Sequence, residues 1–216
     1  MDKRIIFITE NANKFRELQS YFQNYCASLL SSNVNIRITL EMIKPDIEIQ
    51  EIQSLNAEEV IMHKLHNALN TCKHLITTDA ARSTTEAWIM VEDTSLCISK
   101  LGGFPGTFIK FYLQCIPLIN IGNDNWGSDA QSIVNLAIGR IALNDNGNTE
   151  FNITKNFTGV INGCIVNARG NNGFGYDAIF RPINNIQTNA EMSMEEKAFY
   201  NPRTLAFQKV LDYLYS

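Results

Sequence analysis

The chain has 216 residues, of which 45% are hydrophobic and 19% are charged, and its formal net charge is −4. This length suits a single domain with its own core, and the composition excludes an intrinsically disordered chain. The acidic balance argues against nucleic acid as a partner, because proteins that bind polyanions need a basic face, whereas a small triphosphate needs only a local cluster of cations.

The cysteines and the hydrophobic runs indicate where the protein works. Five cysteines, an odd number, are widely scattered along the chain, which favours a reducing compartment. No apolar run reaches the length of a signal-peptide core or of a membrane span. We therefore expect a cytoplasmic protein with no membrane partner.

The first third of the chain predicts a β-α-β start. Residues 3–9 form a short apolar run typical of a strand, and residues 34–40 alternate with a period of two. Between them, apolar residues recur at steps of three and four, as on one face of a helix, at Phe15, Leu18, Phe22, Tyr25 and Leu29. Asn56 and Glu59 resemble a capping box that starts a second amphipathic helix, which we expect to end near residue 73.

The middle of the chain predicts an apolar strand that ends in acids. Residues 74–87 are polar and are expected to form an exposed loop. Residues 88–91 then form a strand that delivers Glu92-Asp93-Thr94, and residues 96–98 continue it before a glycine-rich turn at 102–106.

The remaining elements are predicted from periodicity and turn residues. Helices are expected at 107–114, at 128–137, after Ser193 and at 204–214. Strands are expected at 139–144, 150–157 and 158–166, with a hairpin turn at 144–147. Glycines 170, 173 and 175 predict a tight loop before the apolar run 178–180.

The pattern Thr9-x-Asn11-x-x-Lys14 lies where a strand passes into a helix. Free backbone N–H groups and the helix dipole make such a place suitable for phosphate, and these three side chains add donors. An ordinary capping turn followed by a surface lysine would give the same pattern. It is not a Walker loop, because the glycine-rich lead is absent.

Three carboxylates, Glu51, Glu92 and Asp93, are candidates for holding magnesium next to a phosphate. Adjacent strand residues point to opposite faces, so only one of Glu92 and Asp93 is expected to face a given site. Acids at the end of a strand are, taken alone, more often solvated than catalytic.

Two later segments are candidate functional sites, the first of them for stacking of a purine base. In the segment 173–177, the glycines allow close backbone approach and the aromatic rings offer faces for stacking, although a tight turn with core aromatics would look the same. Segment 190–197, followed by Asn201-Pro202-Arg203, taken alone favours a capped surface helix that ends in a proline turn. His63 and His66 lack a third ligand for zinc, and Lys64 between them is the more interesting side chain.

Taken together and in this order, these segments resemble the inosine triphosphate pyrophosphatase family, which hydrolyses deaminated purine nucleoside triphosphates. The match runs over roughly residues 5–212 and includes Val91-Glu92-Asp93-Thr94-Ser95-Leu96, the Gly-Gly-Phe-Pro-Gly turn at 102–106, Phe174-Gly175-Tyr176-Asp177 and Ala190-Glu191-Met192 with Glu196-Lys197. The resemblance implies an α/β fold with a central mixed β-sheet, flanking helices and two lobes around a nucleotide-binding cleft. It also implies one domain over residues 1–216 and a homodimer.

The resemblance further implies magnesium-dependent conversion of inosine or xanthosine triphosphates to the monophosphate and pyrophosphate, which cleans the nucleotide pool. Asp93, with Glu92 and Lys14, would serve catalysis, and Glu51 and Asp93 would hold the magnesium. The triphosphate would be bound by Thr9, Asn11, Lys14, Lys64, Thr94 and Lys110. The base would lie against Phe174, Gly175, Tyr176 and Asp177, with Lys197 nearby and Arg203 donating to the carbonyl at purine position 6.

Three departures from the family pattern keep alternatives open. Pro202 replaces the histidine of the family's Ser-His-Arg, Glu10 replaces a glycine beside the expected phosphates, and residues 74–90 suggest a loop insertion before the acidic strand. One alternative is the same chemistry with another base, such as uridine or thymidine triphosphate. The other is a paralogue that binds nucleotides without turning them over.

Overall fold

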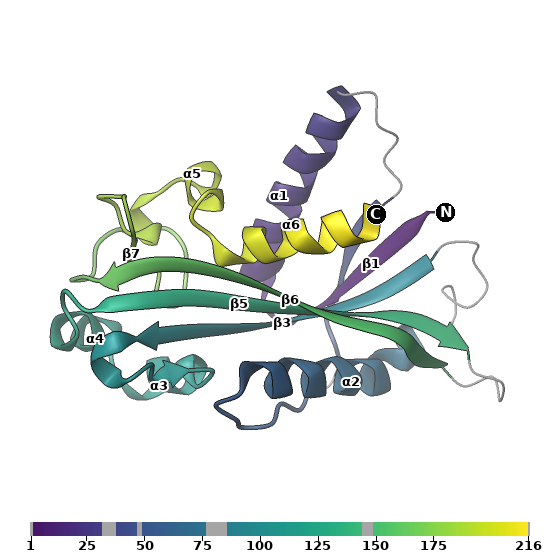
Figure 1. Ribbon diagram of the computed structural model, residues 1–216, viewed down its shortest axis with the longest axis horizontal. Coiled ribbons are helices and arrows are strands. Elements are labelled where there is room, and N and C mark those ends of the chain that lie inside the picture. The colour runs from purple at the N-terminus through teal and green to yellow at the C-terminus, as the bar shows by residue number, and fades with distance from the viewer. Residues whose placement is uncertain (1, 32–37, 47–48, 77–85, 144–148, 216) are drawn as a thin grey trace.

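The computed structural model describes residues 2–31, 38–46, 49–76, 86–143 and 149–215, and a mixed β-sheet forms its centre (Figure 1). The strand order is β2-β1-β3-β5-β6-β7. The strands are β1 (Lys3–Ile8), β2 (Ile38–Ile43), β3 (Glu86–Ile98), β5 (Asp129–Leu143), β6 (Thr149–Ile165) and β7 (Phe180–Pro182), and a short β4 (Pro105–Gly106) pairs with β3. Strand β1 runs parallel to both β2 and β3, whereas the pairs from β3 to β7 are antiparallel.

Helices cover both faces of the sheet (Figure 1). Helices α1 (Ala12–Ser31) and α6 (Pro202–Tyr215) pack on one face, and α2 (Ala57–Ile76) packs on the other. Along β3 the side chains alternate between the two cores: Trp88 and Met90 join the α1/α6 core, while Ile89 and Val91 join the α2 core. The same alternation carries on into the acidic pair that follows.

A second lobe lies at one end of the long strands, where β3 and β6 end and β5 begins. It contains η1 (Ser99–Leu101), α3 (Ile109–Cys115), α4 (Leu118–Asp124), η2 (Asn189–Glu191) and α5 (Met194–Ala198). A separate apolar core holds this lobe together, with Leu96, Ile121, Ile165, Ile179 and Phe180 fully buried. The predicted α/β class, with a central mixed sheet and two lobes, is confirmed. None of the described helices is both long and apolar enough to cross a bilayer.

The prediction of a helix at 128–137 is wrong, because these residues belong to strand β5. Their apolar residues recur at helical spacing only because β5 is a central strand: Val134 packs in the α1/α6 core, Ala137 in the α2 core and Ala130 in the far lobe. A strand buried on both faces loses the alternation that identifies it. The two strands predicted at 150–157 and 158–166 are one strand, β6, and the short helix α4 was not predicted.

Other boundaries also differ from the expectations. Helix α2 continues to Ile76 and β3 begins at Glu86, so residues 86–90 of the predicted insertion are strand, and residues 77–85 lie outside the described part. Residues 34–37 and the turn at 144–147 lie outside it as well. Asn56 caps α2 by accepting from Glu58 N at 3.0 Å, but no capping box forms, because the Glu59 carboxylate accepts from the Ser54 hydroxyl instead.

Candidate functional site

The first part of the site is the junction between β1 and α1. Asn11 begins the helix, because its side-chain oxygen accepts from the backbone N–H groups of Asn13 and Lys14 at 3.0 and 3.3 Å. The Thr9 hydroxyl accepts from Asn11 N at 3.1 Å, which fixes the turn before the helix. Since β1 lies between β2 and β3, this polar turn follows an internal strand of the sheet.

A cleft of about 600 Å³ opens beside this turn. Its walls come from the β1–α1 turn, the segment before α2, β3, α3, the loop that follows β6, and the start of α6. With the exception of Glu92, all the residues predicted for the site line this cleft: Thr9, Asn11, Lys14, Glu51, Lys64, Asp93, Thr94, Lys110, Phe174, Gly175, Tyr176, Asp177, Lys197 and Arg203. Residues up to 194 positions apart in sequence are thus brought to one cavity.

Glu92 lies behind the cleft wall, only 2% exposed, and serves as an acceptor for cations. Its carboxylate accepts from Arg203 Nε at 2.7 Å and Arg203 Nη2 at 2.9 Å, and it forms an ion pair with Lys14 Nζ at 3.0 Å. Burial opposes its charge, but Arg203 and Lys14 outweigh that effect and lower the pKa of Glu92 to about 2. Glu92 therefore stays ionised and holds the two cations in place.

Asp93 points to the other face of β3 and forms part of the cleft wall. It is 8% exposed, and its Oδ2 is buried without a hydrogen-bond partner among the described residues. Burial raises the pKa of Asp93 to about 6, although Lys14 and Lys64 oppose the change. An unpartnered buried carboxylate oxygen calls for a cation or a proton beside it.

Glu51 brings a second carboxylate to the same end of the cleft. Lys64 Nζ lies 2.6 Å from Glu51 Oε1 and also donates to the backbone carbonyl of Glu92 at 2.9 Å. Burial works against the charge of Glu51, but the nearby Lys64 outweighs it and lowers the pKa of Glu51. Within the described ranges no three histidine, cysteine or acidic side chains form a metal cluster. Two carboxylates nevertheless fit magnesium, which commonly takes its other ligands from water and substrate phosphates.

The opposite end of the cleft is built around Phe174. The Phe174 N–H donates to Asp177 Oδ2 at 2.8 Å, and Lys197 Nζ lies 2.7 Å from the same oxygen. A Cβ on Gly173, which has a φ of +86°, would lie 2.2 Å from Asp177 Oδ2, so this turn requires glycine. The Lys197 ammonium and the Arg203 guanidinium lie 5.1 and 5.6 Å from the centre of the Phe174 ring.

Tyr176 is an uncharged part of the cleft wall. Its hydroxyl is 2.7 Å from Ser132 Oγ on β5, and burial raises its pKa well above the usual range. The ring also packs edge-on against Phe180 in the core of the far lobe. Tyr176 thus links the Phe174 end of the cleft to the second lobe.

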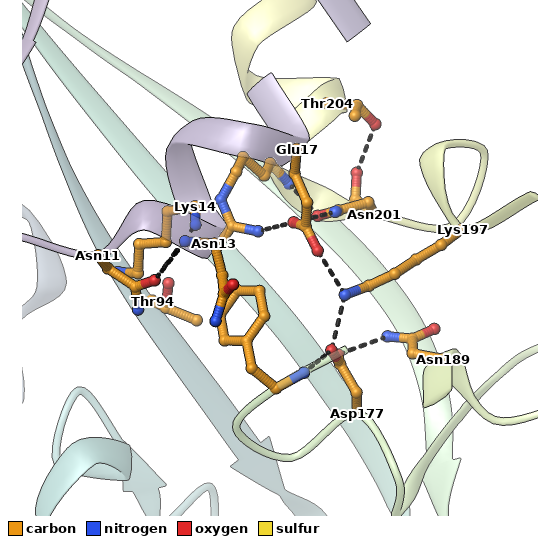
Figure 2. Close-up of polar contacts among 12 residues, drawn as sticks. Asn11, Asn13, Lys14, Glu17, Thr94, Asp177, Asn189, Lys197, Asn201 and Thr204 are labelled. Atoms are coloured by element: carbon orange, nitrogen blue, oxygen red, sulfur yellow. Dashed lines mark hydrogen bonds and ion pairs between the residues drawn. The ribbon is translucent and has the colours of Figure 1, made fainter. Parts of the chain in front are cut away.

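Glu17 is a site residue that sequence reasoning missed. It lies on α1, one turn after Lys14, is 9% exposed, and accepts from Lys197 Nζ at 2.6 Å, from Asn201 Nδ2 at 2.7 Å and from Arg203 Nη1 (Figure 2). Burial opposes the ionised form, but Arg203 and Lys197 together lower the pKa of Glu17. The available signal was its position three residues after Lys14, on the same face of the helix.

Through Glu17, six buried or partly buried groups of alternating charge connect the two ends of the cleft: Lys14, Glu92, Arg203, Glu17, Lys197 and Asp177. Every charge in this chain touches a neighbour of opposite sign, which offsets the cost of removing it from water.

The residues that depart from the family pattern also lie here. Glu10 is exposed and Pro202 is buried, and both line the cleft. The two histidines on α2 are engaged elsewhere: Asn67 Nδ2 lies 3.0 Å from His63 Nδ1, and the ring of His66 packs near Phe151.

Comparison with known proteins identifies the family of this chain. The inosine triphosphate pyrophosphatase of Kluyveromyces lactis is 28% identical over 219 residues, covering 98% of this chain and 96% of that protein. The dITP/XTP pyrophosphatase of Saccharolobus solfataricus is 33% identical over 214 residues, covering 99% and 94%. The solved structure of the Staphylococcus aureus Ham1 protein has the same fold, with a TM-score of 0.63 at 21% identity over 98% of both chains. The sequence model of the Ham1 family matches residues 5–213, and the chain belongs to this family.

Proposed function

We propose that this protein hydrolyses inosine and xanthosine triphosphates, and their deoxy forms, to the nucleoside monophosphate and pyrophosphate, and so cleans the nucleotide pool. It is an enzyme of the pyrophosphatase class, to which its relatives belong by name. The observation that carries the proposal is a cleft with lysines and carboxylates at one end and an aromatic ring at the other. A triphosphate and a purine base have this same separation of charge and stacking surface.

The phosphate end supplies positive charge from three elements. Lys14 comes from α1, Lys64 from α2 and Lys110 from α3, and all three line the cleft. The N-terminus of α1 adds the positive end of its dipole. We assign the hydroxyls of Thr9 and Thr94 and the amide of Asn11 to further phosphate contacts.

Glu51 and Asp93 would hold magnesium, which when bound neutralises phosphate charge and favours attack at phosphorus. The unpartnered Oδ2 of Asp93 and its raised pKa suit a group that takes a proton from water. We therefore assign to Asp93 the orientation and deprotonation of the attacking water. Glu92 would act from behind, by keeping Lys14 in position.

At the base end, Phe174 would stack on the purine, with Gly175, Tyr176 and Asp177 shaping the pocket and Lys197 beside it. Arg203 donates once each from Nε, Nη1 and Nη2 to Glu92 and Glu17, so, as far as the described residues go, two of its five N–H groups are left for a base carbonyl. A carbonyl at position 6 accepts from such a donor, whereas the amino group of adenine leaves it unpaired, which is costly.

Pro202 favours a second candidate, the same reaction on another base such as uracil or thymine. A proline lacks both the imidazole and the backbone N–H that the family's histidine offers at this position. The substrate series below decides between the two candidates.

The test is pyrophosphate release from inosine, xanthosine, guanosine, adenosine and uridine triphosphates with magnesium, coupled to an inorganic pyrophosphatase. Asp93→Asn should lower kcat by about 100-fold or more, as expected for loss of a general base and a metal ligand. Asp129→Asn is the matched control, since Asp129 is exposed on the neighbouring strand and does not line the cleft.

Preference for inosine or xanthosine triphosphate that collapses in Asp93→Asn and survives in Asp129→Asn would support the proposal. Faster turnover of uridine triphosphate would favour the second candidate. Tight nucleotide binding with no turnover of any triphosphate would contradict the reaction itself. We also propose, from the family resemblance, that the protein acts in the cytoplasm as a homodimer. Light scattering of the purified protein would check the homodimer.

A further inference from the structure

We propose that Asn201 is a positioning residue for base selectivity, acting through the Glu17 carboxylate; this inference rests on the function proposed above. Asn201 immediately precedes α6, is 4% exposed and lines the cleft. Figure 2 shows its amide directed toward Glu17.

Both halves of the Asn201 amide are used. Its oxygen accepts from the backbone N–H of Arg203 at 2.9 Å and thereby caps α6, while its nitrogen donates to Glu17 Oε2 at 2.7 Å. These two partners define the orientation of the amide, because a flipped amide would set a donor against the Arg203 N–H and an oxygen against a carboxylate. The backbone carbonyl of Asn201 also accepts from the Thr204 hydroxyl at 2.8 Å.

Asparagine alone meets both demands at this position. Serine is a good cap residue, but its shorter side chain bears one hydroxyl and cannot span the cap and Glu17 in the same way. Aspartate also caps a helix, but it would present an oxygen to the Glu17 carboxylate instead of a donor. The side chain therefore couples the start of α6 to a carboxylate on α1.

The start of α6 is itself held tightly against the sheet. A Cβ on Gly159 of β6 would lie 1.9 Å from the carbonyl oxygen of Pro202 and 2.8 Å from Ala206 N, so the helix backbone rests directly on the glycine. Pro202 occupies the first helical position, where its fixed φ suits the helix and no N–H is needed. Asn201 is thus attached to a rigid support.

Glu17 connects the fixed Asn201 side chain to the cations at the base end. Its other oxygen accepts from Lys197 at 2.6 Å, and Arg203 donates to the oxygen that Asn201 also contacts. These two cations lie over the Phe174 ring, where we place the base. Without the Asn201 donor, the carboxylate could rotate, and both cations would lose their fixed direction toward the base edge.

The experiment compares wild type and Asn201→Ser in kcat/KM for inosine and adenosine triphosphates. We expect the ratio of the two values to fall about tenfold, in the range for a lost hydrogen bond to a charged group. The loss should appear mainly in KM for inosine triphosphate, because the phosphate end is untouched. Asn201→Asp keeps the cap and replaces the donor by a repelling oxygen, so it should reduce the ratio further; it also serves if Asn201→Ser does not fold.

Two controls separate positioning from stability. Asn125→Ser removes another buried amide, 2% exposed and bonded to the Ile121 carbonyl at 2.9 Å, from the far side of the second lobe; it should lower the melting temperature and leave the ratio unchanged. In a double-mutant cycle, Asn201→Ser should add no further loss of selectivity to Glu17→Ala, because Glu17→Ala removes both oxygens and with them the acceptor of the Asn201 amide.

A binding measurement tests the role of Asn201 without relying on turnover. Calorimetric affinities for inosine and adenosine triphosphates in EDTA should show the same fall in ratio. A selective wild-type enzyme whose selectivity is unchanged in both Asn201 variants would overturn this inference and leave the proposed function standing. Independent, multiplying losses in the cycle would also overturn it. If wild type turned over neither nucleotide, the proposed function would fail, and the binding ratios alone would decide the role of Asn201.

Discussion

Replacing Glu92 by glutamine removes one negative charge from the middle of the buried charged chain. In wild type, the Glu92 carboxylate accepts from Arg203 at 2.7 and 2.9 Å, contacts Lys14 Nζ at 3.0 Å and accepts from the Thr94 hydroxyl at 2.9 Å. A glutamine amide offers one oxygen and turns an NH₂ group toward these donors. At least one cation then stays buried without an adequate acceptor.

The size of the effect follows from the electrostatics of the pair. The pKa of Glu92 is lowered from 4.5 to about 2, which corresponds to about 3 kcal/mol of stability. Removing one partner of a buried ion pair typically costs about 3–5 kcal/mol. The value from the pKa of Glu92 agrees with this range. Because the folded-state pKa lies below the unfolded one, this contribution is complete above pH 4.5 and is lost as the pH falls toward about 2.

The assay is chemical denaturation in metal-free buffer at several pH values between 7 and 3, followed by circular dichroism. We expect Glu92→Gln to be less stable than wild type by about 3 kcal/mol at pH 7 and to show a smaller decline in stability below pH 4.5, because Glu17 and Glu51 still titrate there. Glu86→Gln is the control, since Glu86 lies on the same strand but pairs with the half-exposed Arg140, and it should cost less than about 1 kcal/mol. A Glu92→Gln variant within about 1 kcal/mol of wild type at pH 7 would refute the reasoning.

Three further predictions concern activity, packing and capping. Asp93 must be ionised to bind magnesium or take a proton, and burial raises its pKa to about 6 in the metal-free protein, so kcat/KM at low magnesium concentration should fall as the pH drops below about 6; a profile that stays flat down to pH 5 would contradict this role. Gly159→Ala places a Cβ 1.9 Å from the Pro202 carbonyl oxygen and should cost about 1–3 kcal/mol or more, seen as a lower melting temperature; an unchanged melting temperature would show that α6 can move freely. Asn56→Ala removes the cap on Glu58 N and should cost about 1 kcal/mol in denaturation experiments, whereas Asn56→Ser should restore most of it.

Features that depend only on residues nearby in sequence were predictable from the sequence. The strand β1, the polar turn from Thr9 to Asn11 and the helix with Lys14 follow from a short apolar run, capping residues and a period of three to four. The alternation along β3 predicted that Glu92 and Asp93 point to opposite faces, and the cleft indeed contains Asp93 and excludes Glu92. The roles assigned to these residues stay predictions.

The strand expected at 139–144 is the second part of β5, but its first part, residues 129–137, was mistaken for a helix because its identity depends on the strands that pair with it. It pairs with β3 on one side and β6 on the other, and helices cover both of its faces. Apolar residues are therefore needed on both faces, and their spacing accidentally matches a helix. The hydrogen bonds that make these residues a strand are formed with segments far away in sequence.

The row of alternating charges beside the cleft likewise depends on the tertiary structure. In sequence, Glu17 is the single acid on an amphipathic helix, with nothing local to show its partners, and Asn201 is one of many asparagines. They meet, 184 positions apart, only because α1 and α6 pack on the same face of the sheet. By itself the sequence determined which local segments carry donors, acids and turns, since these depend on backbone propensity and nearest neighbours. Which of those groups are buried, which charges are paired and which face the cleft depends on desolvation by distant segments, and only the folded chain sets that.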